Sequence, residues 1–352
     1  MNHEVSPPAA YDAVLLVSFG GPDGPDDVMP FLENVLRGRN VPRERMLEVA
    51  EHYHHFGGKS PINDQNRALL AALRAELDQR GPHLPVYWGN RNWHPLLTDT
   101  LREMADAGVK RALAFVTSGF SCYSGCRQYR ENIAAAREPL GDRAPVVDKI
   151  RVFFNHPGFV GAMARNVRSA ADRLGGGADL PVLFTAHSIP MSMAETSKYV
   201  AQLTEASRLV AEQAGLTNWR LVYQSRSGPP TQPWLEPDVC DTIRELAAEG
   251  VKKLVVAPIG FISDHMEVLY DLDTEAADLC GELGIEMARA ATAGTDPEFI
   301  GMVRDLIAER ACGLPDRVAI GGMPASHDVC PLDCCPAPPM RRPERPAAQP
   351  AS

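Results

Sequence analysis

Short apolar runs alternate with amphipathic stretches along most of the chain, and this alternation limits the folds it can adopt. Apolar runs at 11–19, 84–88 and 109–117 are each followed by a turn and a segment of helical periodicity. Helices are expected at 26–37, 63–80 and 96–107. Strands that alternate with helices pair in parallel, and the helices cover the faces of the sheet. We therefore predict an α/β fold of doubly wound, Rossmann-like parallel sheets.

A repeated pattern indicates two such lobes. Residues 103–111 resemble residues 245–253, and each segment precedes an apolar run that ends in a Gly-Phe pair. Any helix-glycine-strand unit would look similar, so the repeat alone leaves both explanations open. A cleft between two related lobes is a common ligand site. The predicted segments are a flexible arm at 1–10, a first lobe at 11–145, a second lobe at 146–322 and a Cys/Pro-rich C-terminal tail at 323–352.

Charge and hydropathy argue against several classes of function. The formal net charge of -10 disfavours binding to nucleic acid or to an anionic membrane surface. Apolar runs stay well short of the roughly 18 residues that a membrane-spanning helix needs. The first residues lack the basic and apolar regions of a signal peptide, so a cytoplasmic protein is expected.

Two polar stretches follow apolar runs, at the place where open α/β sheets bind ligands. His187 comes directly after the run at 181–184, and Pro190 then prevents the strand from continuing. Asp264, Glu267 and Asp271 follow a second run, with a spacing that would place them on one helical face near a positive partner. A turn histidine and a capping box starting at Asp264 are the structural alternatives.

Five of the eight cysteines form two groups. Cys122 and Cys126 lie close together in the first lobe, and three more cysteines lie within six residues of the tail. Those three are Cys330, Cys334 and Cys335. In a reducing compartment such groups indicate metal binding more than disulfides, although a loose tail of reduced thiols is the alternative. Neighbouring side chains diverge in an extended chain, so two adjacent cysteines need a tight turn to share one site.

Six stretches in family order resemble the ferrochelatases, which insert ferrous iron into a porphyrin. They are LVSFGGP at 16–22, GGKSP at 57–61, YSGCRQY at 123–129, TAHSIP at 185–190, PWLEPD at 233–238 and DHMEVLYD at 264–271. The last is highly specific and the first is weak alone. The resemblance implies two Rossmann-like lobes around a cleft, with His187 and Glu267 binding the iron and carrying the catalysis.

The resemblance also implies the substrate contacts. Ser60 and Tyr129 correspond to residues that touch the macrocycle or its propionates, and Tyr53 is a further candidate. Phe19 stands where many bacterial members carry a tyrosine that ligates iron, and phenylalanine can only supply an apolar wall. The sequence looks most like the actinobacterial branch, which is associated with coproporphyrin III. A protoporphyrin IX ferrochelatase and a non-catalytic haem or metal carrier are the alternatives.

A cofactor and partners follow from the same resemblance. Some members of this branch carry a 2Fe–2S cluster held by one internal and three C-terminal cysteines, which would be Cys126, Cys330, Cys334 and Cys335 here. Cys122 is the alternate internal ligand. Ferrous iron and the porphyrin are then the substrates, and the enzymes that act before and after this one in haem synthesis are the expected protein partners.

Overall fold

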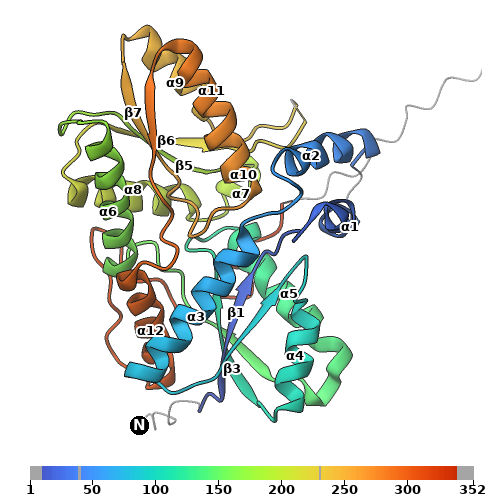
Figure 1. Ribbon diagram of the computed structural model, residues 1–352. Coiled ribbons are helices and arrows are strands. Elements are labelled where there is room, and N and C mark those ends of the chain that lie inside the picture. Colours follow the sequence, from blue (N-terminus) through green and yellow to red (C-terminus); the bar gives the residue numbers. More distant parts are fainter. Residues whose placement is uncertain (1–9, 39–40, 230, 339–352) are drawn as a thin grey trace, which may run out of the picture.

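Two parallel sheets, one in each lobe, form the framework of the chain (Figure 1). The computed structural model describes residues 10–38, 41–229 and 231–338. Residues 1–9 of the arm expected at 1–10, and the end of the tail at 339–352, lie outside the described residues. The first sheet has the order β2-β1-β3-β4 and the second the order β6-β5-β7-β8. The α/β fold with two lobes that we predicted is confirmed.

Each sheet is built from short, mostly apolar strands that pair in parallel. The strands of the first sheet are β1 Ala13–Ser18, β2 Val86–Asn90, β3 Arg111–Val116 and β4 Val146–Lys149. Those of the second sheet are β5 Val182–His187, β6 Trp219–Gln224, β7 Lys253–Ala257 and β8 Glu286–Arg289. All six side chains of β1 are buried, because both faces of this central strand are covered.

Helices cover the sheets on both sides. In the first lobe they are α1 Pro25–Val35, α2 Arg43–His55, α3 Ile62–Arg80, α4 Leu97–Asp106, η1 Tyr123–Arg127, α5 Gln128–Arg137 and η2 Glu138–Arg143. In the second lobe they are α6 Pro157–Arg173, α7 Met191–Ala194, α8 Tyr199–Ala214, α9 Val239–Ala248, α10 Met266–Val268, η3 Leu269–Ala276, α11 Ala277–Leu283 and α12 Pro297–Ala311. Among the described residues, no helix is long and apolar enough to cross a membrane.

The boundary between the lobes lies later than residue 145. β4 pairs with β3 through the register Arg111↔Val146 to Ala114↔Lys149, so it completes the first sheet. Only four residues long, with Lys149 and Asp148 in it, β4 lacks the apolar run that marks the other strands. The first lobe therefore extends at least to Lys149.

The two lobes share one core. α12, the last helix of the second lobe, packs against α3 of the first lobe as well as against α6 (Figure 1). A single cluster of buried side chains joins Phe115 and Phe120 of the first lobe to Phe159, Phe184 and Phe299 of the second. Because one continuous core spans both lobes, their relative position is held by apolar packing rather than by a flexible linker.

The tail returns to the first lobe after α12. Residues 312–338 form turns and coil, and hydrogen bonds from the body hold them. Asn155 donates to the carbonyl of Met323, and Arg130 donates to the carbonyl of Cys330. This path brings the C-terminal cysteines next to η1, which carries Cys126.

Candidate functional site

His187 and Glu267 face each other from two elements of the second lobe. His187 is the last residue of β5, and Glu267 lies in α10, after β7, the strand that pairs with β5. The Nε2 atom of His187 and the Oε2 atom of Glu267 are 3.6 Å apart. Both side chains remain partly exposed, at 32% and 52%. A ligand can therefore reach this pair from solvent.

The ring of His187 is oriented by its neighbours. Its Nδ1 atom contacts the carbonyl oxygen of Ser188, and Tyr199 donates a hydrogen bond of 3.0 Å to the carbonyl of His187. A carbonyl can only accept, so Nδ1 of the neutral ring carries the proton and Nε2 keeps its lone pair toward Glu267. Two electron-pair donors then face each other at 3.6 Å, which suits a cation bound between them. Metal ions lie about 2.0–2.2 Å from such donors, so the spacing fits one shared ion.

The helix after β7 does not have the expected geometry. His265, not Asp264, is the N-cap, and the chain widens from α10 into the π-helix η3. Asp264 turns toward Gln65 of the first lobe and accepts a hydrogen bond of 2.9 Å from Arg289. The expected face of Asp264, Glu267 and Asp271 and the capping box are therefore both wrong, although the positive partner exists. A π-helical stretch leaves no simple periodicity in the sequence.

Asp271 forms a second acidic position behind Glu267. It accepts hydrogen bonds from Gln224 Nε2, at 3.2 Å, and from the hydroxyl of Ser225. Ser225 has a φ of 61°, in the left-handed region, which is unusual for a serine at the end of a strand. Burial, opposed by the Ser225 hydrogen bond and reinforced by the nearby charge of Glu267, raises the pKa of Asp271 to about 7. Asp271 can therefore exchange protons near neutral pH.

Helix α2 lies close to η3, the π-helix that carries Asp271. The His52 ring stacks on the Tyr270 ring of η3, with centroids 3.7 Å apart. A cavity of about 470 Å³ opens there, lined by Glu51, His52, His54, His55 and Tyr270. Burial raises the pKa of the Tyr53 hydroxyl, and the charge of Glu267 adds to this effect, so Tyr53 lies within electrostatic reach of Glu267.

Ser60 and Tyr129 are too deeply buried to contact a ligand in this conformation. Ser60 is 2% exposed and Tyr129 is 5% exposed. The turn at Gly20 and Gly21 packs onto Ser60, since a Cβ atom on Gly21 would lie 2.7 Å from the Ser60 Cβ. These glycines serve close packing of two loops. Phe19 is only partly buried and packs against Phe31 beside Trp93, so it remains available as an apolar wall.

Arg91 is a candidate site residue that we did not predict. Its guanidinium lies 4.4 Å from the centre of the Tyr129 ring and 5.5 Å from that of Phe19. Asn132 accepts a hydrogen bond of 2.7 Å from it. Arg91 follows β2 directly, and a lone arginine after a strand with no further motif is a weak signal. The stacked, partly exposed guanidinium joins two of the expected substrate contacts and suits a carboxylate ligand.

The cysteines of the tail converge on Cys126. Hydrogen bonds from the thiols of Cys330 and Cys335 lower the pKa of Cys126, and the same contacts raise the pKa of both donors. The sulfur atoms of Cys334 and Cys335 are 3.6 Å apart. Cys335 has a φ of 50°, which provides the tight turn that adjacent cysteines need. Cys122 instead accepts a hydrogen bond from the Gly125 amide as the N-cap of η1.

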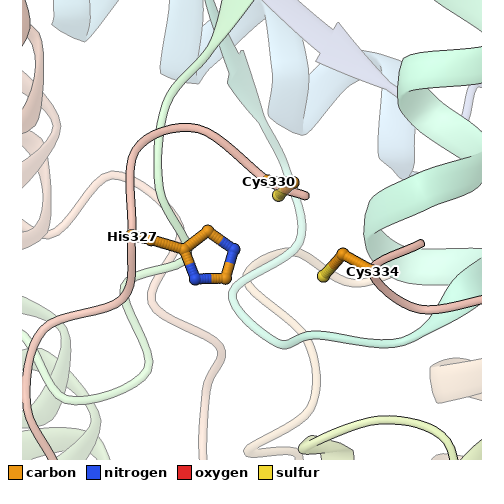
Figure 2. Close-up of side chains that lie close together, drawn as sticks. All are labelled: His327, Cys330 and Cys334. Atoms are coloured by element: carbon orange, nitrogen blue, oxygen red, sulfur yellow. The ribbon is translucent and has the colours of Figure 1, made fainter. Parts of the chain in front are cut away.

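A histidine joins this group of cysteines. One ligand atom each from His327, Cys330 and Cys334 lies within 4.8 Å of the other two, and Figure 2 shows the three side chains around one small space. A cavity of about 10 Å³ is lined by these three residues together with Cys126 and Lys149. The spacing His-x2-Cys-x3-Cys was the available sequence signal for His327.

Known proteins resemble this chain along most of its length. The ferrochelatase family model matches residues 11–311. A ferrochelatase of Rhodopirellula baltica is 63% identical, with 95% of each chain covered. The coproporphyrin III ferrochelatase of Streptomyces griseus subsp. griseus is 53% identical over 97% of this chain and 96% of the relative. That of Streptomyces coelicolor is 54% identical over 96% of each chain.

Solved structures share the fold at low sequence identity. SirB from Bacillus subtilis with Fe3+ has a TM-score of 0.54 and 10% identity, with 86% of this chain and 96% of that chain covered. This likeness supports the two-lobe architecture and nothing finer. The family model and the relatives both extend over nearly all of this sequence, and on that evidence the chain belongs to the ferrochelatase family.

Proposed function

We propose that the protein inserts ferrous iron into coproporphyrin III in haem synthesis, with His187 and Glu267 as the catalytic pair. The observation that carries the proposal is the 3.6 Å approach of two lone-pair donors from two neighbouring segments of the second lobe. Relatives at 53% and 54% identity are named coproporphyrin III ferrochelatases, which supports the choice of porphyrin. The relative at 63% identity carries a name that specifies no porphyrin, so protoporphyrin IX is the second candidate.

The residues at the site fit the balance of the reaction. One Fe²⁺ enters the ring, and the two pyrrole N–H protons leave as two H⁺. The lone pair of His187 Nε2 binds the incoming iron, and the Glu267 carboxylate accepts a proton from the ring. Asp271, whose pKa is raised to about 7 by burial, is placed to take up a proton near neutral pH and release it.

The propionate groups of a porphyrin need positively charged or hydroxyl partners, and the first lobe offers such groups. Arg91 offers a guanidinium that is already oriented by Asn132 and by the Tyr129 ring. Such preorganisation lowers the entropy lost when the guanidinium binds a carboxylate. Phe19 and Trp93, at the same end of the lobe, supply apolar surface for the ring face. Ser60 and Tyr129 stay proposed contacts, and both need a local opening before they can touch a ligand.

An anaerobic insertion assay with ferrous iron tests this proposal directly. Coproporphyrin III and protoporphyrin IX are compared at equal concentrations, with kcat/KM measured for each. A clear preference for coproporphyrin III is expected, since it offers four carboxylates in place of two. Equal or better turnover of protoporphyrin IX refutes the substrate, and tight porphyrin binding with no insertion would instead favour a carrier.

We also propose a 2Fe–2S cluster at the C-terminal cysteines. Four thiolates are the usual ligands of such clusters, and pairwise contacts link Cys126 to Cys330 and Cys335, and Cys335 to Cys334, which supports the proposal. Thiolates bind one metal ion at about 2.3 Å, which implies about 3.7 Å between two sulfurs in a tetrahedral site. The 3.6 Å between Cys334 and Cys335 fits that value. Cys126, Cys330, Cys334 and Cys335 would hold the cluster, which would supply a covalent link between the tail and the first lobe.

Anaerobic purification followed by iron, acid-labile sulfide and EPR measurements tests the cluster. Two irons and two sulfides per chain are expected beyond any iron in the active site. Fully active protein without sulfide would refute the cluster. Thiolate ligands require a reducing compartment, and we propose the cytoplasm, with neighbouring enzymes of haem synthesis as partners.

A further inference from the structure

Arg289 joins the two ends of the segment that carries Glu267. It is the last residue of β8, where the register Val256↔Arg289 fixes its backbone to the second sheet. Its Nε atom donates a hydrogen bond of 2.6 Å to Asp273, and its Nη1 atom donates one of 2.9 Å to Asp264. These two acids lie on either side of Glu267 along the chain, and the three bridging side chains are each at most one-third exposed.

Gln65 holds the same segment from the first lobe. Its Oε1 atom accepts a hydrogen bond of 2.8 Å from the Asp264 amide, and its Nε2 atom donates to the Asp264 carboxylate at 3.3 Å. Gln65 lies in α3, which begins two residues after Ser60, a proposed porphyrin contact. One helix therefore connects the loop of Ser60 to the start of the segment that carries Glu267.

The segment depends on these ties because its first helix is very short. α10 has only three residues, and η3 continues it with π-helical turns. The first four N–H groups of a helix find no partner inside it, so those of α10 rely on neighbouring groups. Within the described part of the chain, the N-cap His265 offers α10 no side-chain hydrogen bond. The position of Glu267 is therefore set by contacts from outside the helix.

We propose that Arg289 and Gln65 are positioning residues that set the distance between Glu267 and His187. Two donors that share one ion at about 2.1 Å in a tetrahedral site lie roughly 3.4 Å apart, and the observed separation of 3.6 Å is close to this value. A shift of about 1 Å would spoil the fit, and a misplacement of that size can cost about 100-fold in rate. The inference rests on the proposed catalytic role of this pair.

Kinetics of the full-length chain test the inference. R289M should lower kcat for iron insertion at least about 10-fold, with the KM for coproporphyrin III within about 2-fold of wild type, because Arg289 is not a proposed porphyrin contact. R289K keeps the charge but loses the planar fork, so it should recover only part of kcat. Q65L and D273N each remove one tie and should give intermediate values of kcat, and they carry the test if R289M folds poorly.

Arg304 provides a matched control. It also bridges two acids, Glu76 at 3.4 Å and Asp305 at 2.6 Å, and its exposure of 27% is close to the 18% of Arg289. This bridge joins the two lobes through α12 and α3 and leaves the segment of Glu267 untouched. R304M should lower stability in urea as R289M does, yet keep kcat within about 2-fold of the wild type. Equal losses of kcat in the two variants would overturn the inference.

A double variant separates positioning from a general weakening of the fold. If Arg289 acts through Glu267, R289M should cause no further loss of single-turnover insertion in an E267Q background, whereas independent effects would multiply and refute the inference. Loss of insertion in E267Q with a wild-type kcat in R289M would refute the positioning role and leave the proposed function standing. Normal insertion by E267Q would refute the catalytic pair, and the positioning role with it.

Discussion

Replacing Asp271 with asparagine should remove a pH dependence from the stability of the protein. The pKa of Asp271 is raised from 3.8 to about 7, chiefly by burial. Between these values the native state binds a proton that the unfolded state has released, so the free energy of unfolding falls as the pH rises from about 4 to 7. Below about 4 and above about 7 this contribution is flat. From pH 5 to pH 8 the loss is on the order of 2–3 kcal/mol.

The asparagine side chain can be accommodated locally. Gln224 Oε1 is buried and has no hydrogen-bond partner among the described residues, so a rotated Gln224 amide can accept from the new N–H group. The Ser225 hydroxyl can still donate to the remaining oxygen. The hydrogen-bond cost is therefore small and independent of pH, and it does not hide the change in slope.

Urea unfolding at pH 5, 6, 7 and 8 measures this effect. D271N should become more stable relative to the wild type as the pH rises, with the gain complete shortly above pH 7. The exposed residue Asp278 lies on α11 close to Asp271 in sequence, and D278N is the control that should follow the wild type. Parallel stability curves for D271N and the wild type would show that Asp271 ionises as an ordinary carboxyl group.

Four further substitutions test other parts of the structure. H187A and E267Q should each lower the rate of iron insertion at least about 100-fold. Porphyrin binding and thermal stability should stay near wild type, because both side chains are partly exposed. Near-normal turnover of either variant would refute the role of that residue in catalysis. R151M leaves the buried carboxylate of Glu309 without its ion-pair partner. The free energy of unfolding in urea should fall by about 3–5 kcal/mol. A fall below about 1 kcal/mol would show that the buried ion pair matters little for stability. R91L should raise the KM for coproporphyrin III about 10-fold or more with a smaller change in kcat, and an unchanged KM would remove Arg91 from the substrate site.

The sequence predicted the elements that have a regular pattern. The strand at Ala13–Ser18 and the helix at Ile62–Arg80 lie within a residue or two of the expected ranges, because apolar runs and helical periodicity are local signals. The resemblance to the ferrochelatases is confirmed by the family model and by relatives along nearly the whole chain. His187 and Glu267 do approach each other, although their roles remain predictions.

Features that depend on contacts between distant segments could not be predicted. β4 is too short and too polar to be identified before its pairing with β3 is known. Asp264 lies before the N-cap His265 and turns toward Gln65 and Arg289, while Asp271, inside η3, faces Gln224. Pattern analysis assumes 3.6 residues per turn, and a π-helix breaks that assumption. The place of His327 beside Cys126 depends on the tail folding back onto the first lobe, which the local sequence does not reveal.

The hydrophobic core that both lobes share determines which part of the molecule can open to admit a large flat ligand. Val28, Phe31, Leu32 and Ala50 form a small separate cluster that holds α1 and α2 together, whereas the two sheets are bonded through one large aromatic core. Breaking the large core would expose far more apolar surface than displacing the small cluster.

Local opening motions should therefore be concentrated in helices α1 and α2, while the two sheets stay nearly rigid. The stack of His52 on Tyr270 is one contact between α2 and the second lobe, and it lies beside the cavity lined by His52, His54 and Tyr270. Opening of these two helices would separate the His52 and Tyr270 rings, and hydrogen exchange in α2 should be faster than in β1 by many orders of magnitude.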